Sequence, residues 1–378
     1  MKKTLVLLLA LLMALSMFAG CQNAAPAAAP AAPTAAPAAE PAAQPAAEPT
    51  AEATVEETVD PASIKGEVSV YVAHNGDQYN RAIELFNKKY PNVEVLVVSA
   101  GTGDCLQRIA AEAENPQCDV MWGGTTESLE AYKQYFQPYV CSEDSHIAES
   151  FKDPDDKWIG ESQQPSVIMY NKKLVPESEV PKTWAELADP KWEGKIASAN
   201  PASSGSAYTL LCNIILSESK QADYSDGWTF IEQLAKNIVI SGGSSSVYKG
   251  VANGEYALGL TLEQLAWVFV GSDPDTCGMI YPTDGSSNVP DGFAMVKDCP
   301  NPDMAGIFMD FLVGPECQQV MSDEFGRRTV RDDLDQPAAL PKLGDIYFIN
   351  YDFAWAGAGK DAVIAKWEEI AVNVIKAS

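Results

Sequence analysis

The spacing of apolar residues predicts alternating strands and helices in the first part of the globular region. Residues 67–73 (EVSVYVA) alternate apolar and polar positions and predict a strand, and residues 78–90 carry apolar positions at helical spacing. Residues 93–99 and 119–122 predict two further strands, with a second helix between them that ends near residue 113. This β-α-β-α-β order predicts a parallel sheet with helices on both faces.

Small polar residues follow the C-terminal end of each of these three strands. His74 and Asn75 follow the first strand, Thr102 follows the second, and Gly124 and Thr125 follow the third. Ligands of open α/β sheets bind beyond the carboxyl ends of the strands. We therefore expect these residues to line a binding cleft.

Two Ser/Gly-rich turns in the second half of the chain each follow a short strand and open a helix. They contain Ser204, Gly205 and Ser206 in the first turn, and Ser244, Ser245 and Ser246 in the second. Either turn alone could simply cap its helix, because serine is a common N-cap residue. Two such turns in one lobe favour an anion-binding pocket built from hydroxyls and free backbone N–H groups.

The remaining pattern predicts a second lobe. A strand at residues 165–170 is expected to cross to it, and strands are also predicted at 195–197, 238–240, 256–260, 278–281 and 293–296. The roughly 315 residues after the tether are too many for one hydrophobic core. We expect one lobe at residues 64–165 and 292–345, and the other at 166–291 and 346–378.

The N-terminal residues have the features of an export signal and a tether. Lys2 and Lys3 precede an apolar run in residues 1–20, and small residues precede Cys21, as in a bacterial lipobox. An ordinary signal peptide with a chance cysteine is the alternative. Residues 21–63 are rich in Ala, Pro, Thr and Glu and cannot bury a core, so we expect a tether that begins at a lipidated Cys21.

Charge and motif content exclude several function classes. The formal net charge of −26 argues against nucleic acid and anionic membrane surfaces as partners. No G-x-S-x-G, H-E-x-x-H or Walker-type spacing occurs, so we expect no enzyme activity, no cofactor and no metal site. Seven cysteines follow Cys21. Two disulfides are possible among them, Cys105–Cys118 and Cys277–Cys299, and the sequence does not decide whether they form.

Several segments together resemble one family. The segments ELFNKKYPNVEV, DVMWGG, SVIMYNKKLVP, PKTWAELADPKWEGKIASANP, VYKGVANGEYALGL and DEFGRRTVR are similar to those of extracellular solute-binding proteins of ABC importers. The resemblance covers nearly all of residues 66–378 and points to the ferric-iron, thiamine, phosphonate and sugar-phosphate binding group. It implies a type II periplasmic-binding-protein fold, α/β, with two lobes, parallel or mixed sheets flanked by helices, and a hinged cleft.

The resemblance also bears on the ligand. The positions of the iron ligands fall at Asn75, Gly124, Gln264 and Leu265, where this chain offers no suitable side chain for ferric iron. We therefore expect a phosphorylated sugar or an organophosphonate, held by the serine turns and Thr125. Glu263, His74, Asn75 and Asp291 are expected to face the rest of the ligand.

Two other classes of ligand are also compatible with the sequence. Ferric iron remains an alternative ligand. A thiamine-like or polyamine cation is another, because the aromatic faces of Trp184, Trp192 and Trp267 could bind an ammonium group. We expect Trp184 and Trp192 to be exposed. The implied partners are a small-molecule ligand and the membrane permease. We expect a monomer, anchored to the outer face of the cell membrane or located in the periplasm.

Overall fold

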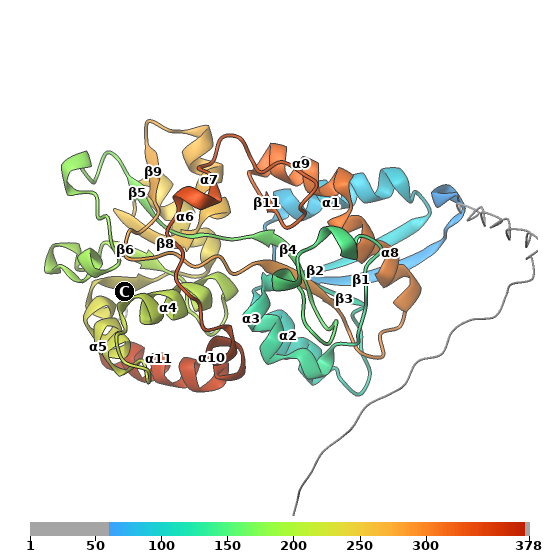
Figure 1. Ribbon diagram of the computed structural model, residues 1–378, viewed down its shortest axis with the longest axis horizontal. Coiled ribbons are helices and arrows are strands. Elements are labelled where there is room, and N and C mark those ends of the chain that lie inside the picture. The colour runs from blue at the N-terminus through green and yellow to red at the C-terminus, as the bar shows by residue number, and fades with distance from the viewer. Residues whose placement is uncertain (1–59, 375–378) are drawn as a thin grey trace, which may run out of the picture. The chain divides into compact units, whose positions relative to one another are not determined.

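The computed structural model describes residues 60–374 (Figure 1). The expected signal sequence, the lipidation site Cys21 and most of the expected tether lie outside the described residues. Among residues 60–374, no helix has both the length and the apolar character that a membrane span needs.

The first sheet has six strands in the order β11-β4-β10-β3-β1-β2. They are β1 (Gly66–Val72), β2 (Val93–Ser99), β3 (Val120–Thr125), β4 (Ile159–Gln163), β10 (Asp291–Met295) and β11 (Arg328–Thr329). The predicted parallel unit is confirmed, because β2, β1 and β3 pair in parallel. Strand β10 returns from the second lobe and pairs antiparallel with both β3 and β4, which makes the sheet mixed.

Helices lie on both sides of this sheet, with α1 and α9 on one side and α2 and α3 on the other (Figure 1). The helices of this lobe are α1 (Gly76–Lys89), α2 (Thr102–Ala111), α3 (Thr126–Ala131), α8 (Pro302–Val313) and α9 (Pro315–Phe325). Helix α1 buries Ala82, Leu85 and Phe86 on one face. It starts earlier than the spacing predicts because the Asn75 side chain caps it, accepting a hydrogen bond from the Gln78 N–H at 3.1 Å.

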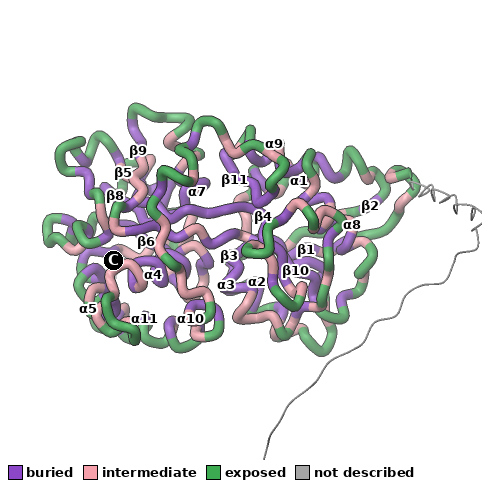
Figure 2. The backbone as a smooth tube through the Cα atoms, viewed as in Figure 1, coloured by how far each residue is buried: buried purple, intermediate pink, exposed green. Residues whose placement is uncertain are grey.

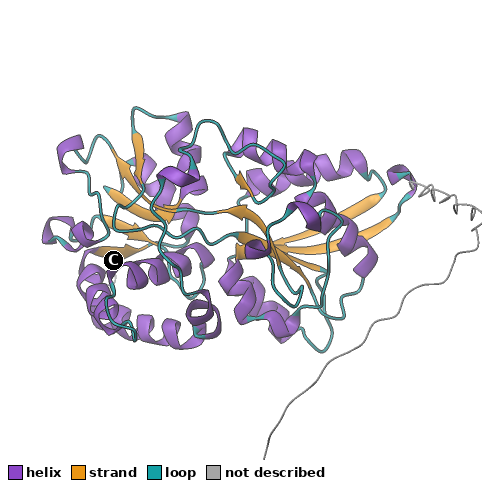
Figure 3. Cartoon of the chain, viewed as in Figure 1, coloured by secondary structure: helices purple, strands orange, loops and turns teal. Residues whose placement is uncertain are grey.

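The second sheet has five strands in the order β7-β6-β8-β5-β9. Helices flank the strands of this lobe as they do in the first (Figure 3). They are β5 (Ser166–Asn171), β6 (Ile196–Ser198), β7 (Ile238–Ile240), β8 (Leu258–Leu262) and β9 (Cys277–Ile280). The helices of this lobe are α4 (Gly205–Glu218), α5 (Ser225–Leu234), α6 (Ser244–Asn253), α7 (Glu263–Ser272), α10 (Phe353–Ala358) and α11 (Lys360–Val374). Strands β7, β6 and β8 are parallel, and β5 runs antiparallel to β8 and β9.

Short 3₁₀ turns join many of these elements. They span Pro61–Ser63, Lys133–Tyr135, Asp144–His146, Glu149–Phe151, Glu177–Glu179, Ala185–Ala188, Pro190–Trp192, Ala235–Asn237 and Leu343–Asp345.

Three segments connect the lobes. The chain passes from β4 to β5 at residues 164–165, from β9 to β10 at 281–290, and from β11 to α10 at 330–352. The predicted lobe boundaries fall in or beside these segments, and we propose the segments as the hinge. Asp291, which the sequence-based boundary put in the second lobe, opens β10 of the first sheet.

Each lobe has its own buried core, which the burial colouring shows as purple strands (Figure 2). Trp184 and Trp192 belong to the core of the second lobe, with 0% and 4% of their surface exposed, so the expectation that they are exposed is wrong. The polar residues around them suggested a surface segment, but both indole rings pack inward. The seven described cysteines are buried free thiols, so neither candidate disulfide is formed.

Candidate functional site

A cavity of about 460 Å³ is lined by residues of both lobes. Five helices contribute residues from their N-terminal ends: α1 and α2 from the first lobe, and α4, α6 and α7 from the second. The N-terminal end of a helix carries a partial positive charge and backbone N–H groups that lack an acceptor within the helix. The cavity is therefore electrostatically suited to an anion.

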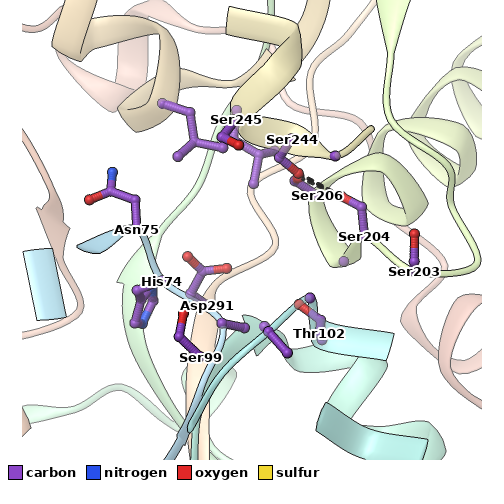
Figure 4. Close-up of a pocket in the computed structure, with 18 of the residues that line it drawn as sticks. His74, Asn75, Ser99, Thr102, Ser203, Ser204, Ser206, Ser244, Ser245 and Asp291 are labelled. Carbon is purple, nitrogen blue, oxygen red and sulfur yellow. Dashed lines mark hydrogen bonds between the residues drawn. The ribbon is translucent and has the colours of Figure 1, made fainter. Parts of the chain in front are cut away.

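Three serine hydroxyls from α4 and α6 form one cluster on the wall of the cavity (Figure 4). The Oγ atom of Ser244 lies 2.7 Å from the Oγ atoms of both Ser204 and Ser206, and the latter two are 3.1 Å apart. We call Ser204, Ser206 and Ser244 the serine cluster. The two serine turns therefore lie side by side, as the sequence analysis predicts.

The two turns differ in how they cap their helices. Ser204 is the N-cap of α4, and its Oγ accepts a hydrogen bond from the Ala207 N–H at 3.3 Å. The N-cap of α6 is Gly243, with φ of +156°, so the prediction that a serine caps this helix is wrong. Ser244 and Ser245 instead occupy the first turn, where their N–H groups have no helical acceptor.

The lobes touch directly beside the serine cluster. The Gly103 N–H of α2 donates to the Ser203 carbonyl at 3.2 Å. A Cβ atom at Gly205 would lie 2.9 Å from the Thr102 Oγ1, and one at Gly124 would lie 2.5 Å from the Thr102 Cγ2. Glycine at both positions thus lets Thr102 enter between the lobes.

An ionic cluster supports the first-lobe side of the cavity. Arg327 is buried and lies 3.3 Å from the Glu161 carboxylate and 3.9 Å from that of Asp291. Its Nη1 donates to the His74 Nδ1 at 3.2 Å, so the His74 Nε2–H donates to Glu161 at 3.0 Å. Arg327 belongs to the DEFGRRTVR segment, and the sequence analysis did not predict its contact with Glu161.

This cluster shifts the pKa values of two carboxyl groups. Burial would raise the pKa of Glu161, but the charge of Arg327 and the hydrogen bonds from His74 and Trp122 lower it to about 2. Burial raises the pKa of Asp291, and the charge of Arg327 only partly offsets that effect. Asp291 lines the cavity and offers carboxylate oxygens that can accept hydrogen bonds.

Most of the predicted site residues line this cavity. They are His74, Asn75, Thr102, Gly124, Ser204, Gly205, Ser206, Ser244, Ser245 and Asp291. Thr125 and Ser246 are not among the lining residues: Thr125 is buried with its hydroxyl 3.3 Å from that of Ser128, and Ser246 is exposed. The three glutamines that also line it, Gln78, Gln164 and Gln264, were not predicted as ligand contacts.

Glu263 does not face the cavity as predicted. Its carboxylate accepts two hydrogen bonds from Arg328, at 2.6 and 2.9 Å, and a third from the Tyr281 hydroxyl at 2.6 Å. Both charged side chains are 1% exposed. The sequence suggested a ligand-binding or solvent-exposed acid, because its arginine partner lies 65 positions away.

The positions at which the resemblance places iron ligands offer no suitable group for a metal, and the candidate tryptophans lie outside the cavity. The four positions implied by the resemblance, Asn75, Gly124, Gln264 and Leu265, all line it, and none provides a carboxylate, imidazole or phenolate. Within residues 60–374, the grouped metal-type ligands are His146, Asp332 and Asp333, outside the cavity. None of the three candidate tryptophans is a lining residue.

Comparison with known proteins identifies the family. The model of the family described as bacterial extracellular solute-binding protein matches residues 129–354. Iron uptake protein A1 of Synechocystis sp. is 26% identical over 285 residues, which cover 69% of this chain and 76% of that protein. A putative 2-aminoethylphosphonate-binding periplasmic protein of Salmonella typhimurium is 23% identical over 334 residues, or 82% of this chain and 94% of that protein.

A solved structure shows the same fold. The periplasmic binding protein AfuA of Actinobacillus pleuropneumoniae, with fructose 6-phosphate bound, superposes with a TM-score of 0.75 at 24% sequence identity. The match covers 83% of this chain and all of that one (100%). The two-lobed periplasmic-binding-protein fold of type II is therefore confirmed. With the family match over more than half of its length, the chain belongs to the bacterial extracellular solute-binding proteins.

Proposed function

We propose that this protein is the solute-binding component of an ABC importer and captures a small anionic solute, a phosphorylated sugar or an organophosphonate. The observation that supports this proposal best is the serine cluster, in which hydroxyls from two helix N-termini lie within hydrogen-bonding distance of one another. The names of the phosphonate-binding relative and of the sugar-phosphate-bound structure agree with it. The family is one of binding proteins, and we propose no catalytic step.

The cluster can bind a phosphoryl or phosphonyl group through neutral donors. Three hydroxyls and the first-turn N–H groups of α4 and α6 surround the same part of the cavity. A hydrogen bond to a charged group contributes about 1.5–3 kcal/mol, and each helix N-terminus adds roughly 0.3–1 kcal/mol. Micromolar affinity requires about 8 kcal/mol, so a few such contacts suffice after entropic costs.

The contacts between the lobes give binding a structural consequence. A ligand held by α4 and α6 of the second lobe and by α1 and α2 of the first would favour the arrangement in which Gly103 and Ser203 are hydrogen-bonded. Ligand binding then shifts the equilibrium between open and closed lobes. A permease that recognises the closed form would receive only the loaded protein.

Location and anchoring complete the proposal. The family consists of extracellular proteins. We propose that Cys21 is lipidated and that residues 21–63 tether the binding unit to the outer face of the membrane, where it acts as a monomer. Stable anchoring needs more than one acyl chain, which a lipidated N-terminal cysteine provides.

A thermal-shift screen of the compact unit, residues 58–378, tests the ligand class. The panel contains glucose 6-phosphate, 2-aminoethylphosphonate, inorganic phosphate, thiamine, spermidine and ferric citrate. A ligand at a hundredfold excess over its Kd stabilises the protein by about 2.7 kcal/mol, which raises the melting temperature by several degrees. A shift with ferric citrate, thiamine or spermidine and none with the phosphorus compounds would overturn the proposal in favour of iron or an organic cation.

A further inference from the structure

The cavity is larger than a phosphoryl group bound at the serine cluster would fill. A water molecule occupies about 30 Å³ in the liquid, and a tetrahedral oxyanion needs the room of only a few waters. A cavity of about 460 Å³ therefore has space for a second, larger part of the ligand. In Figure 4, His74, Asn75, Asp291 and Ser99 lie on the side facing the serines, so these residues border that remaining space.

Buried Arg327 orients the polar residues on this side. It donates to the Ser162 Oγ at 2.6 Å and to the Gln78 Oε1 at 3.4 Å. The Gln164 Nε2 donates to the same Ser162 Oγ at 2.7 Å. Because arginine can only donate, its bond to Gln78 fixes the side-chain oxygen toward Arg327 and leaves the amide nitrogen for another partner.

The charged groups around Arg327 disfavour a second anionic group on this side. Arg327 supplies one positive charge, whereas Glu161 and Asp291 supply two negative charges when both are ionised, and His74 accepts a hydrogen bond from Arg327 as a neutral ring. The balance of these groups is negative; among the other lining residues, Asp104 carries a negative charge and Lys249 of α6 a positive one. The group bound here is therefore neutral or cationic.

Unpartnered atoms distinguish between these two possibilities. Gln78, Gln164 and Gln264 all line the cavity and are at most 2% exposed, and each keeps one side-chain polar atom without a hydrogen-bond partner. Two of these atoms, the Nε2 atoms of Gln78 and Gln264, are donors. An ammonium group cannot accept a hydrogen bond, whereas a hydroxyl can both accept from these amides and donate to the Asp291 carboxylate.

We propose that this glutamine-lined side is a polyol subsite, so that the ligand is a phosphorylated sugar or sugar alcohol rather than an aminoalkylphosphonate or free phosphate. The proposal rests on the proposed function, in which the serine cluster holds the phosphoryl group. Gln78 and Gln264 donate to hydroxyls of the ligand, and Asp291 accepts from them. The remaining unpartnered atom, the Gln164 Oε1, is a further acceptor.

Calorimetric titration with four probes tests this subsite: glucose 6-phosphate, fructose 6-phosphate, hexyl phosphate and 2-aminoethylphosphonate. At least one hexose phosphate is expected to bind tenfold or more tightly than hexyl phosphate and 2-aminoethylphosphonate, since two or three added hydrogen bonds separate them. Equal or tighter binding of hexyl phosphate or of the aminophosphonate would overturn the polyol assignment while leaving the phosphoryl site intact. If none of the four binds, the proposed function fails as well.

A matched pair of variants localises the effect. Gln264→Met keeps the length of the side chain but removes the amide, and it is expected to weaken the hexose phosphate about five- to tenfold while leaving inorganic phosphate binding within twofold. Gln319→Met, at a partly exposed glutamine of α9 that does not line the cavity, is the control and should change neither. Equal loss of both ligands in Gln264→Met, with an unchanged melting temperature of the free protein, would contradict a subsite separate from the phosphoryl site.

Discussion

Arg328 of β11 and Glu263 of α7 form a buried ion pair between the two lobes. Two hydrogen bonds join them, Nε to Oε1 at 2.6 Å and Nη2 to Oε2 at 2.9 Å. Arg328 also donates to the Pro341 carbonyl, in the third segment between the lobes, at 2.7 Å. The pair therefore fixes α7, whose N-terminal end lines the cavity, against the first sheet.

Removing one member of this pair should destabilise the fold strongly. Glu263→Ala leaves the Arg328 charge buried without a partner, a change that costs about 3–5 kcal/mol. Urea unfolding monitored by circular dichroism measures the loss.

The exposed pair between Arg81 and Glu324 provides the control. Its side chains are 26% and 43% exposed, so Glu324→Ala should cost less than about 1 kcal/mol. If Glu263→Ala cost no more than Glu324→Ala, Glu263 would not hold the lobes together.

Two residues of α3, Glu127 and Ser128, make further buried polar contacts with the second lobe. The Thr209 hydroxyl of α4 donates to Glu127, and the Lys360 Nζ donates to the Ser128 Oγ at 2.6 Å. Burial raises the pKa of Glu127 to about 7, although Thr209 and Lys360 oppose the shift. Burial lowers the pKa of Lys360 to about 8.

The raised pKa of Glu127 predicts a decrease in stability as pH rises. The folded protein binds the proton more tightly than the unfolded chain, so this stabilisation is complete below the unfolded pKa near 4.5 and is lost as pH rises toward 7. Between pH 4.5 and 6.5 the wild type should lose about 2 kcal/mol more than Glu127→Gln. Unfolding free energies at these two pH values test this, and parallel curves for the two proteins would contradict it.

Close contact at Gly103 should be needed for lobe closure but not for folding. A Cβ atom there would lie 2.5 Å from the Ala202 carbonyl oxygen of the second lobe. Gly103→Ala should therefore weaken glucose 6-phosphate binding at least tenfold, while α2 itself gains roughly 0.5–1 kcal/mol of helix stability. Calorimetry and small-angle scattering measure both the affinity and the ligand-induced compaction.

Gln107, an exposed residue of the same helix that does not line the cavity, provides the control. Gln107→Ala should bind and compact like the wild type. Normal compaction of Gly103→Ala with ligand would show that the contact between Gly103 and Ser203 does not limit closure.

Local patterns predict much of the fold and part of the cavity. The apolar patterns that predict β1, α1 and β2 each lie within one short segment of the sequence. The parallel unit, and the polar residues that follow its strands, could therefore be predicted from the sequence alone. Because the carboxyl ends of parallel strands meet at one edge, Asn75 and Thr102 could be expected to lie together. Both line the cavity.

Contacts between distant residues could not be predicted in the same way. Arg327 approaches His74 from 253 positions away, and Arg328 neutralises Glu263 from 65 positions away. A single sequence gives no signal for either pairing. The same holds for Trp184, whose indole donates to the Gly285 carbonyl at 2.8 Å inside the second lobe although polar residues surround it in the sequence.

The most direct test of the central claim is the affinity of Ser244→Ala for glucose 6-phosphate, measured by calorimetry beside Ser246→Ala. Ser244 lies in the serine cluster, whereas Ser246 belongs to the same helical turn but does not line the cavity. We expect Ser244→Ala to lose about 1.5–3 kcal/mol of binding free energy, roughly 10- to 150-fold in Kd, and Ser246→Ala to bind like the wild type. Equal affinities of the two variants would contradict a phosphoryl site at the serine cluster.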